Sequence, residues 1–82
     1  ENNGNQPFYY KNCVLICNGE IYNHKNLIEK NNFAMKTDSD CEVIIHLYKR
    51  YGIAATLKLL DAEFAFALYD GDKNKLYFGE QP

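Results

Sequence analysis

Hydrophobic residues along this chain form two pairs of strand-like runs, one pair near each end. Residues 7–10 and 13–17 are largely apolar, and Lys11-Asn12 between them is typical of the tight turn of a β-hairpin. Residues 63–69 form another apolar run, residues 70–74 carry turn-forming Asp, Gly and Asn, and residues 75–78 return as a partner strand. Because both alternating faces of residues 13–17 and 63–69 are apolar, we expect these two strands to be buried on both faces.

Between the strand pairs, apolar residues recur at helical spacing in three segments. The first helix follows a polar junction at residues 18–20 and ends near Lys30, before two asparagines. The second begins with Ser39 and Glu42, whose spacing predicts a capping box, and ends at Gly52. The third covers residues 53–60. This order of strands and helices predicts an α+β fold in which helices cover the faces of a sheet.

Composition limits the classes of function. The 82 residues have the length of one small domain, residues 1–82, and 46% hydrophobic residues indicate a globular core. The net charge of −2 offers no basic stripe, so we expect no nucleic acid and no anionic membrane as partner. No apolar run approaches the roughly 20 residues of a membrane span. Residues 1–6 are a polar leader with the composition of a loop.

The cysteines and histidines have structural explanations. Three cysteines without a signal-peptide pattern fit a reducing, cytoplasmic location better than a disulfide framework. Cys13 and Cys17 share one face of a strand, but zinc-type spacing to further ligands is missing, and no metal site is expected. We expect both, and Cys41, to be buried as small hydrophobic residues. A lone histidine in a helix, such as His24 or His46, is more often a satisfied helical residue than a catalyst.

Asn18 and Gly19 carry the first candidate chemistry. A carboxamide beside a backbone N–H that no Cβ obstructs can direct two hydrogen bonds at one oxygen that becomes negative. The pair therefore predicts an oxyanion hole. On the dipeptide alone, a plain Asn-Gly turn is the commoner explanation.

Glu20 and Asp40 form the second candidate group. Each lies at the entry of a predicted helix, where the helix dipole and free amides keep a carboxylate ionised. If the two junctions meet at one edge of the sheet, the carboxylates can hold an ammonium group beside the oxyanion donors. Helix capping is the structural alternative, above all for Asp40.

These motifs together resemble the glutamine-hydrolysing domain of asparagine synthetases, which are class II amidotransferases of the N-terminal-nucleophile family. The resemblance runs through residues 6–9, 14–24, 39–44 and 64–70. Its most specific part is Asn-Gly-Glu-Ile-Tyr-Asn-His at residues 18–24. The residues after Asn-Gly, and Ser-Asp-Cys-Glu-Val at residues 39–43, resemble the asparagine synthetase branch more than other class II amidotransferases.

The resemblance implies that the chain is part of a four-layer αββα sandwich with antiparallel sheets, and that the family hydrolyses glutamine through a thioester. On the matching positions, Asn18 and the Gly19 amide would form the oxyanion hole, and Glu20 and Asp40 would bind the α-ammonium group of glutamine. No cofactor is implied for this chain. In the family, ammonia passes to a synthetase domain, outside this chain, that uses ATP and magnesium to amidate aspartate. A homodimer is one expected assembly, because unpaired strand edges favour association.

Several features of the family have no counterpart in these residues. The family nucleophile is an N-terminal cysteine whose own amine acts as the base, whereas this chain begins at Glu1, and the arginine that binds the glutamine carboxylate lies upstream as well. Asp38 replaces a usual glycine, and Glu80-Gln81 replaces Arg-Asp. We therefore expect the central part of a glutaminase domain, inactive on its own. The alternatives are a non-catalytic glutamine-binding or structural remnant, and another class II amidotransferase with a different acceptor.

Overall fold

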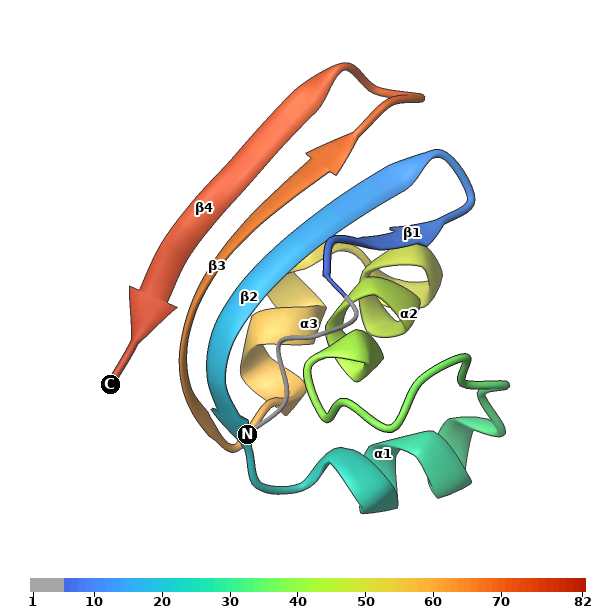
Figure 1. The fold of residues 1–82 in the computed structure, drawn as a ribbon, viewed down its shortest axis with the longest axis vertical. Helices are drawn as coiled ribbons and strands as arrows, with labels where there is room; N and C mark the ends of the chain where they lie inside the picture. The colour runs from blue at the N-terminus through green and yellow to red at the C-terminus, as the bar shows by residue number, and fades with distance from the viewer. Residues whose placement is uncertain (1–5) are drawn as a thin grey trace.

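A computed structural model describes residues 6–82 and shows a four-stranded antiparallel sheet with three helices. The elements in chain order are β1 (Phe8–Tyr10), β2 (Cys13–Ile21), α1 (His24–Asn31), α2 (Glu42–Tyr51), α3 (Ile53–Leu59), β3 (Ala62–Asp70) and β4 (Lys75–Gln81). The strands lie in the order β1-β2-β3-β4 (Figure 1). The predicted α+β order of elements is confirmed. Apart from Gln6, the predicted polar leader lies outside the described residues.

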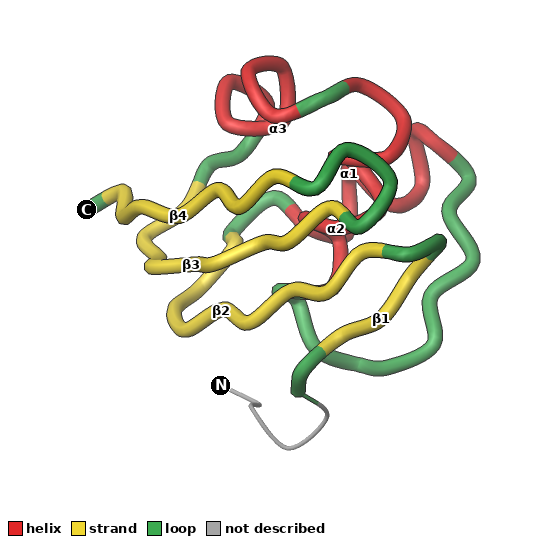
Figure 2. Tube along the Cα trace, turned by 90° about the horizontal axis from the view of Figure 1, so that it is seen from above, coloured by secondary structure: helices red, strands yellow, loops and turns green. Residues whose placement is uncertain are grey.

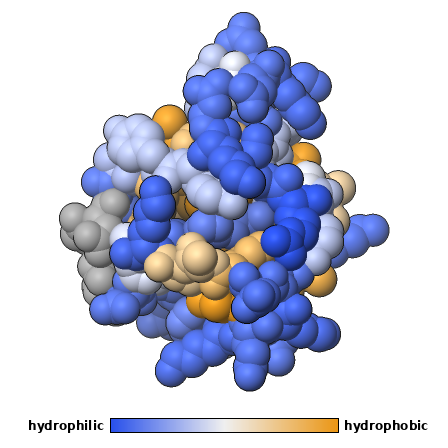
Figure 3. Space-filling view, turned by 90° about the vertical axis from the view of Figure 1, so that its right-hand side faces the viewer, coloured by the Kyte–Doolittle hydropathy of each residue, from blue (hydrophilic) through white to orange (hydrophobic). Residues whose placement is uncertain are grey.

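The helices lie on one side of the sheet. In Figure 1, α2 and α3 sit inside the curve of the strands, and Figure 2 shows the helices gathered beyond one face of the sheet. Residues 42–48 of α2 are all buried, and Leu15, Ile44, Leu47 and Leu68 are fully buried between that helix and the sheet. Burial of each such side chain contributes roughly 1.5–3 kcal/mol. The side of the molecule seen in Figure 3 is largely hydrophilic, with small apolar areas between.

The prediction that two strands are buried on both faces is wrong for the described chain. In β2, Leu15 and Cys17 are buried, but Ile16 between them is 51% exposed; in β3, Leu68 is buried and Tyr69 is 40% exposed. The physical reason is that the helices cover one face and leave the other open. Large apolar or aromatic side chains exposed on that face are Tyr9, Ile16, Tyr69, Leu76 and Phe78. An open apolar face is consistent with part of a sandwich in which a second sheet stacks.

Strand β2 continues past its predicted end. Lys11 and Asn12 form the expected two-residue turn, with φ of 46° and 64°. β2 then pairs with β3 without interruption up to Ile21, which lies opposite Ala62. Residues 18–20 therefore lie inside a strand, so the prediction of a junction after residue 17 is wrong. Neither a plain Asn-Gly turn nor a helix-entry position for Glu20 is observed.

Gly19 allows this uninterrupted pairing. Its φ is +138°, a conformation that side chains rarely adopt, and a Cβ there would lie 2.2 Å from the Glu63 carbonyl oxygen and 2.6 Å from the Phe64 Cα. β3 thus approaches β2 too closely at this point for any side chain. Asn-Gly is typical of turns, but here the glycine serves a close approach of two strands.

The predicted capping box, in which Ser39 and Glu42 bind each other's backbone amides, is wrong. Glu42 is the first residue of α2, and its carboxylate accepts hydrogen bonds from the amides of Lys36 (2.9 Å) and Thr37 (2.8 Å). The Ser39 hydroxyl accepts one from the amide two residues ahead. Burial raises the pKa of Glu42, but the hydrogen bonds from Lys36, His46 and Thr37 outweigh it and lower the pKa overall. Glu42 therefore ties the connection before α2 to the helix.

The other helix ends agree with the sequence to within one or two residues. α1 ends at Asn31, and Asn32 follows in the left-handed conformation with φ of 57°. Gly52 ends α2, as predicted, and α3 ends at Leu59. None of the helices in residues 6–82 is long and apolar enough to cross a membrane.

We predict that Gly19→Ala lowers the free energy of unfolding by about 2–4 kcal/mol, because the new Cβ must push β3 away. Urea denaturation measures this loss. Gly79→Ala is the matched control, since its Cβ would meet a Phe66 ring atom at an ordinary 3.7 Å. The control should change the free energy by less than about 1 kcal/mol. Equal losses in both variants would contradict the assigned role of Gly19.

Candidate functional site

Strand β2 is longer than its neighbour β1, so among residues 6–82 part of one edge of β2 has no strand partner. β1 pairs with β2 only as far as Leu15, and β2 continues to Ile21. Backbone groups of alternate residues in a strand point to the same edge. The N–H groups of Cys17, Gly19 and Ile21 therefore face the side on which β1 has ended, and their partners determine what this edge can bind.

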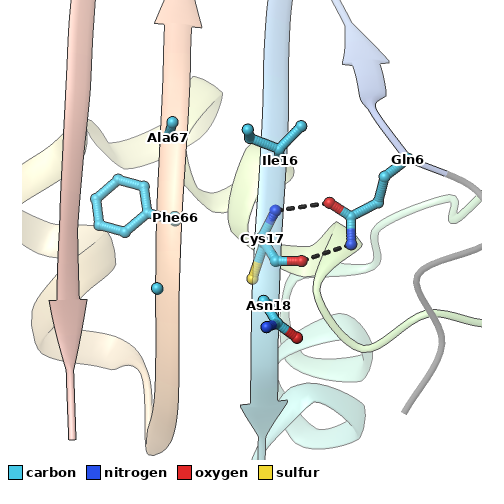
Figure 4. A pocket seen from close by; sticks show the side chains of 7 residues that line it. Gln6, Ile16, Cys17, Asn18, Phe66 and Ala67 are labelled. Atoms are coloured by element: carbon cyan, nitrogen blue, oxygen red, sulfur yellow. Dashed lines mark hydrogen bonds between the residues drawn. The ribbon is translucent and has the colours of Figure 1, made fainter.

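The first of these amides is bonded to a side chain. The Cys17 N–H donates to Gln6 Oε1 at 2.6 Å, and Gln6 Nε2 donates to the Cys17 carbonyl at 2.5 Å. Figure 4 shows the Gln6 carboxamide beside β2, on the side away from β3. Both backbone groups of Cys17 are thus occupied.

The third amide is bonded to Asp40. The Ile21 N–H donates to Asp40 Oδ2 at 2.7 Å. Asp40 lies in the turn before α2, so this bond brings the two polar segments of the sequence together. Asp40 binds the residue that directly follows Glu20. The carboxylate of Asp40 binds the strand instead of capping the helix, so the capping alternative is not observed.

The middle amide, that of Gly19, donates to no group among residues 6–82. It lies between two amides that are already bonded, one to Gln6 and one to Asp40. An unpaired amide at a fixed position is a donor available to a ligand.

Asn18 places a second donor next to this amide. Its side chain lies on the open face of the sheet, is exposed, and makes no hydrogen bond to residues 6–82. A cavity of about 470 Å³ lies over this point, and Figure 4 shows its lining side chains on β2 and β3. It is lined by Gln6, Ile16, Cys17, Asn18, Ala65, Phe66 and Ala67. This volume is within the range of small-molecule sites.

Glu20 lies on the same face as Asn18 and directly opposite Glu63 on β3. Both glutamates are exposed, and the Tyr22 hydroxyl donates to Glu63 Oε1 at 2.9 Å. This hydrogen bond raises the pKa of Tyr22, and Glu20 adds to the effect. The sheet thus carries a pair of carboxylates near the Asn18 carboxamide, an arrangement that favours a cationic group. Sequence analysis missed Glu63, because its position opposite Glu20 follows only from the strand register.

The remaining motif residues hold the end of β2 in place. Asn23 donates to the Leu59 carbonyl at 2.9 Å and accepts from the Asp61 amide at 3.0 Å. His24 Nδ1 lies 3.0 Å from the Ile21 carbonyl oxygen. His46 is buried in α2, with Nε2 2.9 Å from Glu42 Oε2. Both histidines are therefore satisfied helical residues with structural contacts.

The three cysteines are buried and unbridged, as predicted. The Cys17 thiol donates to Cys41 Sγ at 2.7 Å, which raises the pKa of Cys17 and lowers that of Cys41. Burial raises the pKa of Cys13. All three side chains belong to the helix-covered core, on the opposite face of the sheet from Asn18. Among residues 6–82, no three His, Cys, Asp or Glu side chains are placed to hold a metal ion.

Comparisons with known proteins identify the family of the chain. A family model described as a glutamine amidotransferase domain matches residues 1–82. The chain is 48% identical over 75 residues, 90% of its length, to a probable glutamine-hydrolysing asparagine synthetase of Acanthamoeba polyphaga mimivirus, and covers 14% of that protein. It is 49% identical over 71 residues, 84% of its length, to a probable asparagine synthetase of Schizosaccharomyces pombe, covering 13% of it.

A third relative is asparagine synthetase [glutamine-hydrolyzing] 2 of Bacillus subtilis, which is 42% identical over 88 residues, with 98% of this chain covered. The chain spans between 12% and 14% of the length of these three relatives. The family match covers the whole chain, and the identities far exceed those of unrelated sequences. The chain therefore belongs to the glutamine amidotransferase domain family, in the branch found in glutamine-hydrolysing asparagine synthetases.

Proposed function

We propose that this chain supplies the oxyanion hole and the ammonium-binding carboxylates of a glutaminase site, which hydrolyses glutamine to glutamate and ammonia. One observation carries the proposal: the Gly19 amide, which no group of the described part of the chain binds, lies beside the exposed Asn18 carboxamide and between two amides that are already bonded. Two free donors at adjacent positions suit an oxygen that gains negative charge during the reaction.

In this proposal, a thiolate from outside these residues attacks the side-chain amide carbon of glutamine. The carbonyl oxygen receives the electron pair of the broken π bond, and the donors at Asn18 and Gly19 stabilise the resulting oxyanion. The amine that took the proton of the thiol returns it to the amide nitrogen, and collapse of the oxyanion then breaks the C–N bond, releases ammonia and leaves a thioester. Water hydrolyses this thioester through a second oxyanion at the same donors, with glutamate and the regenerated thiol as products. Because β3 holds Gly19 rigidly in the strand, little reorganisation is needed when charge develops.

Asp40 and Glu20 would bind the α-ammonium group of the substrate. One carboxylate oxygen of Asp40 accepts from the Ile21 amide, which fixes the side chain, and no hydrogen bond from residues 6–82 occupies the other oxygen, Oδ1. Charge-assisted hydrogen bonds of this kind are worth roughly 1.5–3 kcal/mol. Glu63, opposite Glu20, adds negative charge on the same face of the sheet.

The names of the relatives support a wider proposal for the protein that carries this chain. Ammonia from the glutaminase site would pass to a synthetase domain of the same polypeptide, where ATP and magnesium would support amidation of aspartate to asparagine. No step in the present chain uses the nucleotide or the metal. We further propose an N-terminal-nucleophile mechanism, a cytoplasmic location and a homodimeric assembly.

For the protein at its natural length, we predict that Asn18→Ala lowers kcat for glutamine hydrolysis about 100- to 1,000-fold, because one oxyanion donor is lost. KM should change little, since the donor acts mainly in the transition state. Steady-state release of ammonia measures both constants.

Asn26→Ala is the matched control for this variant, because Asn26 is exposed on α1 and faces solvent. Its kcat should equal that of the parent. If Asn18→Ala retained full turnover, the oxyanion assignment would be wrong. If the parent bound glutamine in calorimetry without releasing ammonia, the non-catalytic binding module would be the better account.

Asp40→Asn separates charge from structure, because an amide oxygen can still accept the hydrogen bond from Ile21. We expect KM for glutamine to rise about 10- to 100-fold as the ionic contact is lost, with the melting temperature nearly unchanged. Asp38→Asn removes the same charge two residues away, at an exposed position, and should leave KM within about twofold of the parent. If both variants raised KM equally, Asp40 would contribute only through the net charge of the protein and not through a direct contact with the ammonium group.

A further inference from the structure

Gln6 occupies the position of a missing strand residue. The pairs Tyr10↔Cys13 and Phe8↔Leu15 set the register between β1 and β2. Two residues further along the same register, Gln6 would lie opposite Cys17. β1 begins only at Phe8, so the backbone ladder has ended at this point, and the carboxamide side chain of Gln6 makes the two hydrogen bonds instead.

Because the Gln6 side chain, and not a strand backbone, binds Cys17, two consequences follow for the neighbouring residues. The Cys17 carbonyl belongs to the peptide unit whose nitrogen is that of Asn18, so the bond from Gln6 Nε2 fixes one end of this unit. Pairing of Asn18 with Ala65 on β3 fixes the other end. The peptide unit between Cys17 and Asn18 is thereby held from both edges of β2.

The second consequence concerns Gly19. A strand that continued along β2 would cover the edge to which the Gly19 N–H points. A single side chain binds both backbone groups of Cys17, while the next amide on the edge has no partner within the described residues. Gln6 therefore borders the open position without occupying it, and it also lines the cavity beside Asn18 (Figure 4).

We propose that Gln6 is a positioning residue for the Asn18–Gly19 oxyanion hole: its carboxamide acts through the Cys17 backbone to orient both donors. The inference rests on the proposed function and assigns to Gln6 a role that neither the motif at residues 18–24 nor the two carboxylates fulfil. Gln6 itself need not touch the reacting atoms.

The test uses the protein at its natural length with Gln6→Glu and Gln6→Leu. A carboxylate at this position can accept from the Cys17 N–H but cannot donate to the Cys17 carbonyl, so we expect kcat for glutamine hydrolysis to fall at least 10-fold at about pH 8 with KM within about twofold. When the introduced carboxyl takes up a proton, the missing donor returns. The ratio of variant to parent kcat should therefore rise as the pH falls from about 8 to 5, because the nearby carbonyl favours the protonated form.

Gln6→Leu has no donor at any pH, so its deficit in kcat should persist across the range. Asn26→Asp makes the same change from amide to carboxylate on the exposed face of α1 and should follow the parent at every pH. Circular dichroism at both ends of the range checks that each variant is folded. A purely structural role for Gln6 would lower the melting temperature without a pH-dependent recovery of kcat.

The outcomes separate this inference from the proposed function. If Asn18→Ala loses turnover while both Gln6 variants keep kcat within twofold of the parent, the oxyanion hole stands and the role of Gln6 is overturned. A rise in KM with unchanged kcat in the Gln6 variants would also overturn it, since Gln6 would then act in substrate binding. If the parent releases no ammonia, both proposals fail together.

Discussion

The antiparallel pairing of β2 with β3, nine residues against nine, is the constraint on which the rest of this structure depends. It supplies the two central strands, whose inward side chains form the core against α2. It also occupies one edge of β2 completely, so that backbone amides of β2 can meet a ligand only at the other edge. Gly19 makes the pairing continuous, because a side chain at this position would collide with the β3 backbone.

On the edge of β2 that faces away from β3, the amides of three alternate residues differ in their hydrogen-bond partners. Gln6 binds the amide of Cys17, Asp40 binds that of Ile21, and the amide of Gly19 between them is unpaired among residues 6–82. Buried or partly buried backbone amides are almost always satisfied, so side chains that satisfy two neighbours and leave one unpaired define a site. Asp40 has two roles. Its Oδ2 binds the Ile21 amide at the edge of β2, and the same bond orients the carboxylate.

Much of the fold could be predicted from local patterns. The Lys11-Asn12 turn, the helix end at Gly52 and the order of elements follow from turn chemistry and apolar spacing, which act within a few residues. Predictions that needed partners distant in sequence were less accurate. Asn18-Gly19 suggests a turn on local grounds, but its conformation is set by β3, more than 40 residues later. Glu42 matched the spacing of a capping box, but the connection before α2 offered its carboxylate other amides.

The candidate site divides in the same way. Asn18, Gly19, Glu20 and Asp40 could be identified by residue type and by resemblance to a family, and the structure brings Asp40 to the end of β2 beside Glu20. Glu63 and Gln6 could not be identified, because their relation to the site exists only through strand register. Apolar patterning also could not show that the helices cover one face alone. The uncovered face is itself informative, since it carries Asn18, Glu20 and the cavity.

The most direct test of this account is amide hydrogen exchange at residues 17, 19 and 21, followed by NMR in the protein at its natural length. Bonded amides are protected from exchange to the extent that the local structure stays closed. We predict that Cys17 and Ile21 are protected in the free protein, that Gly19 exchanges much faster than either, and that Gly19 becomes protected when glutamine or glutamate binds. Strong protection of Gly19 in the free protein, or no change on ligand binding, would contradict the claim that this amide is the open donor of the site.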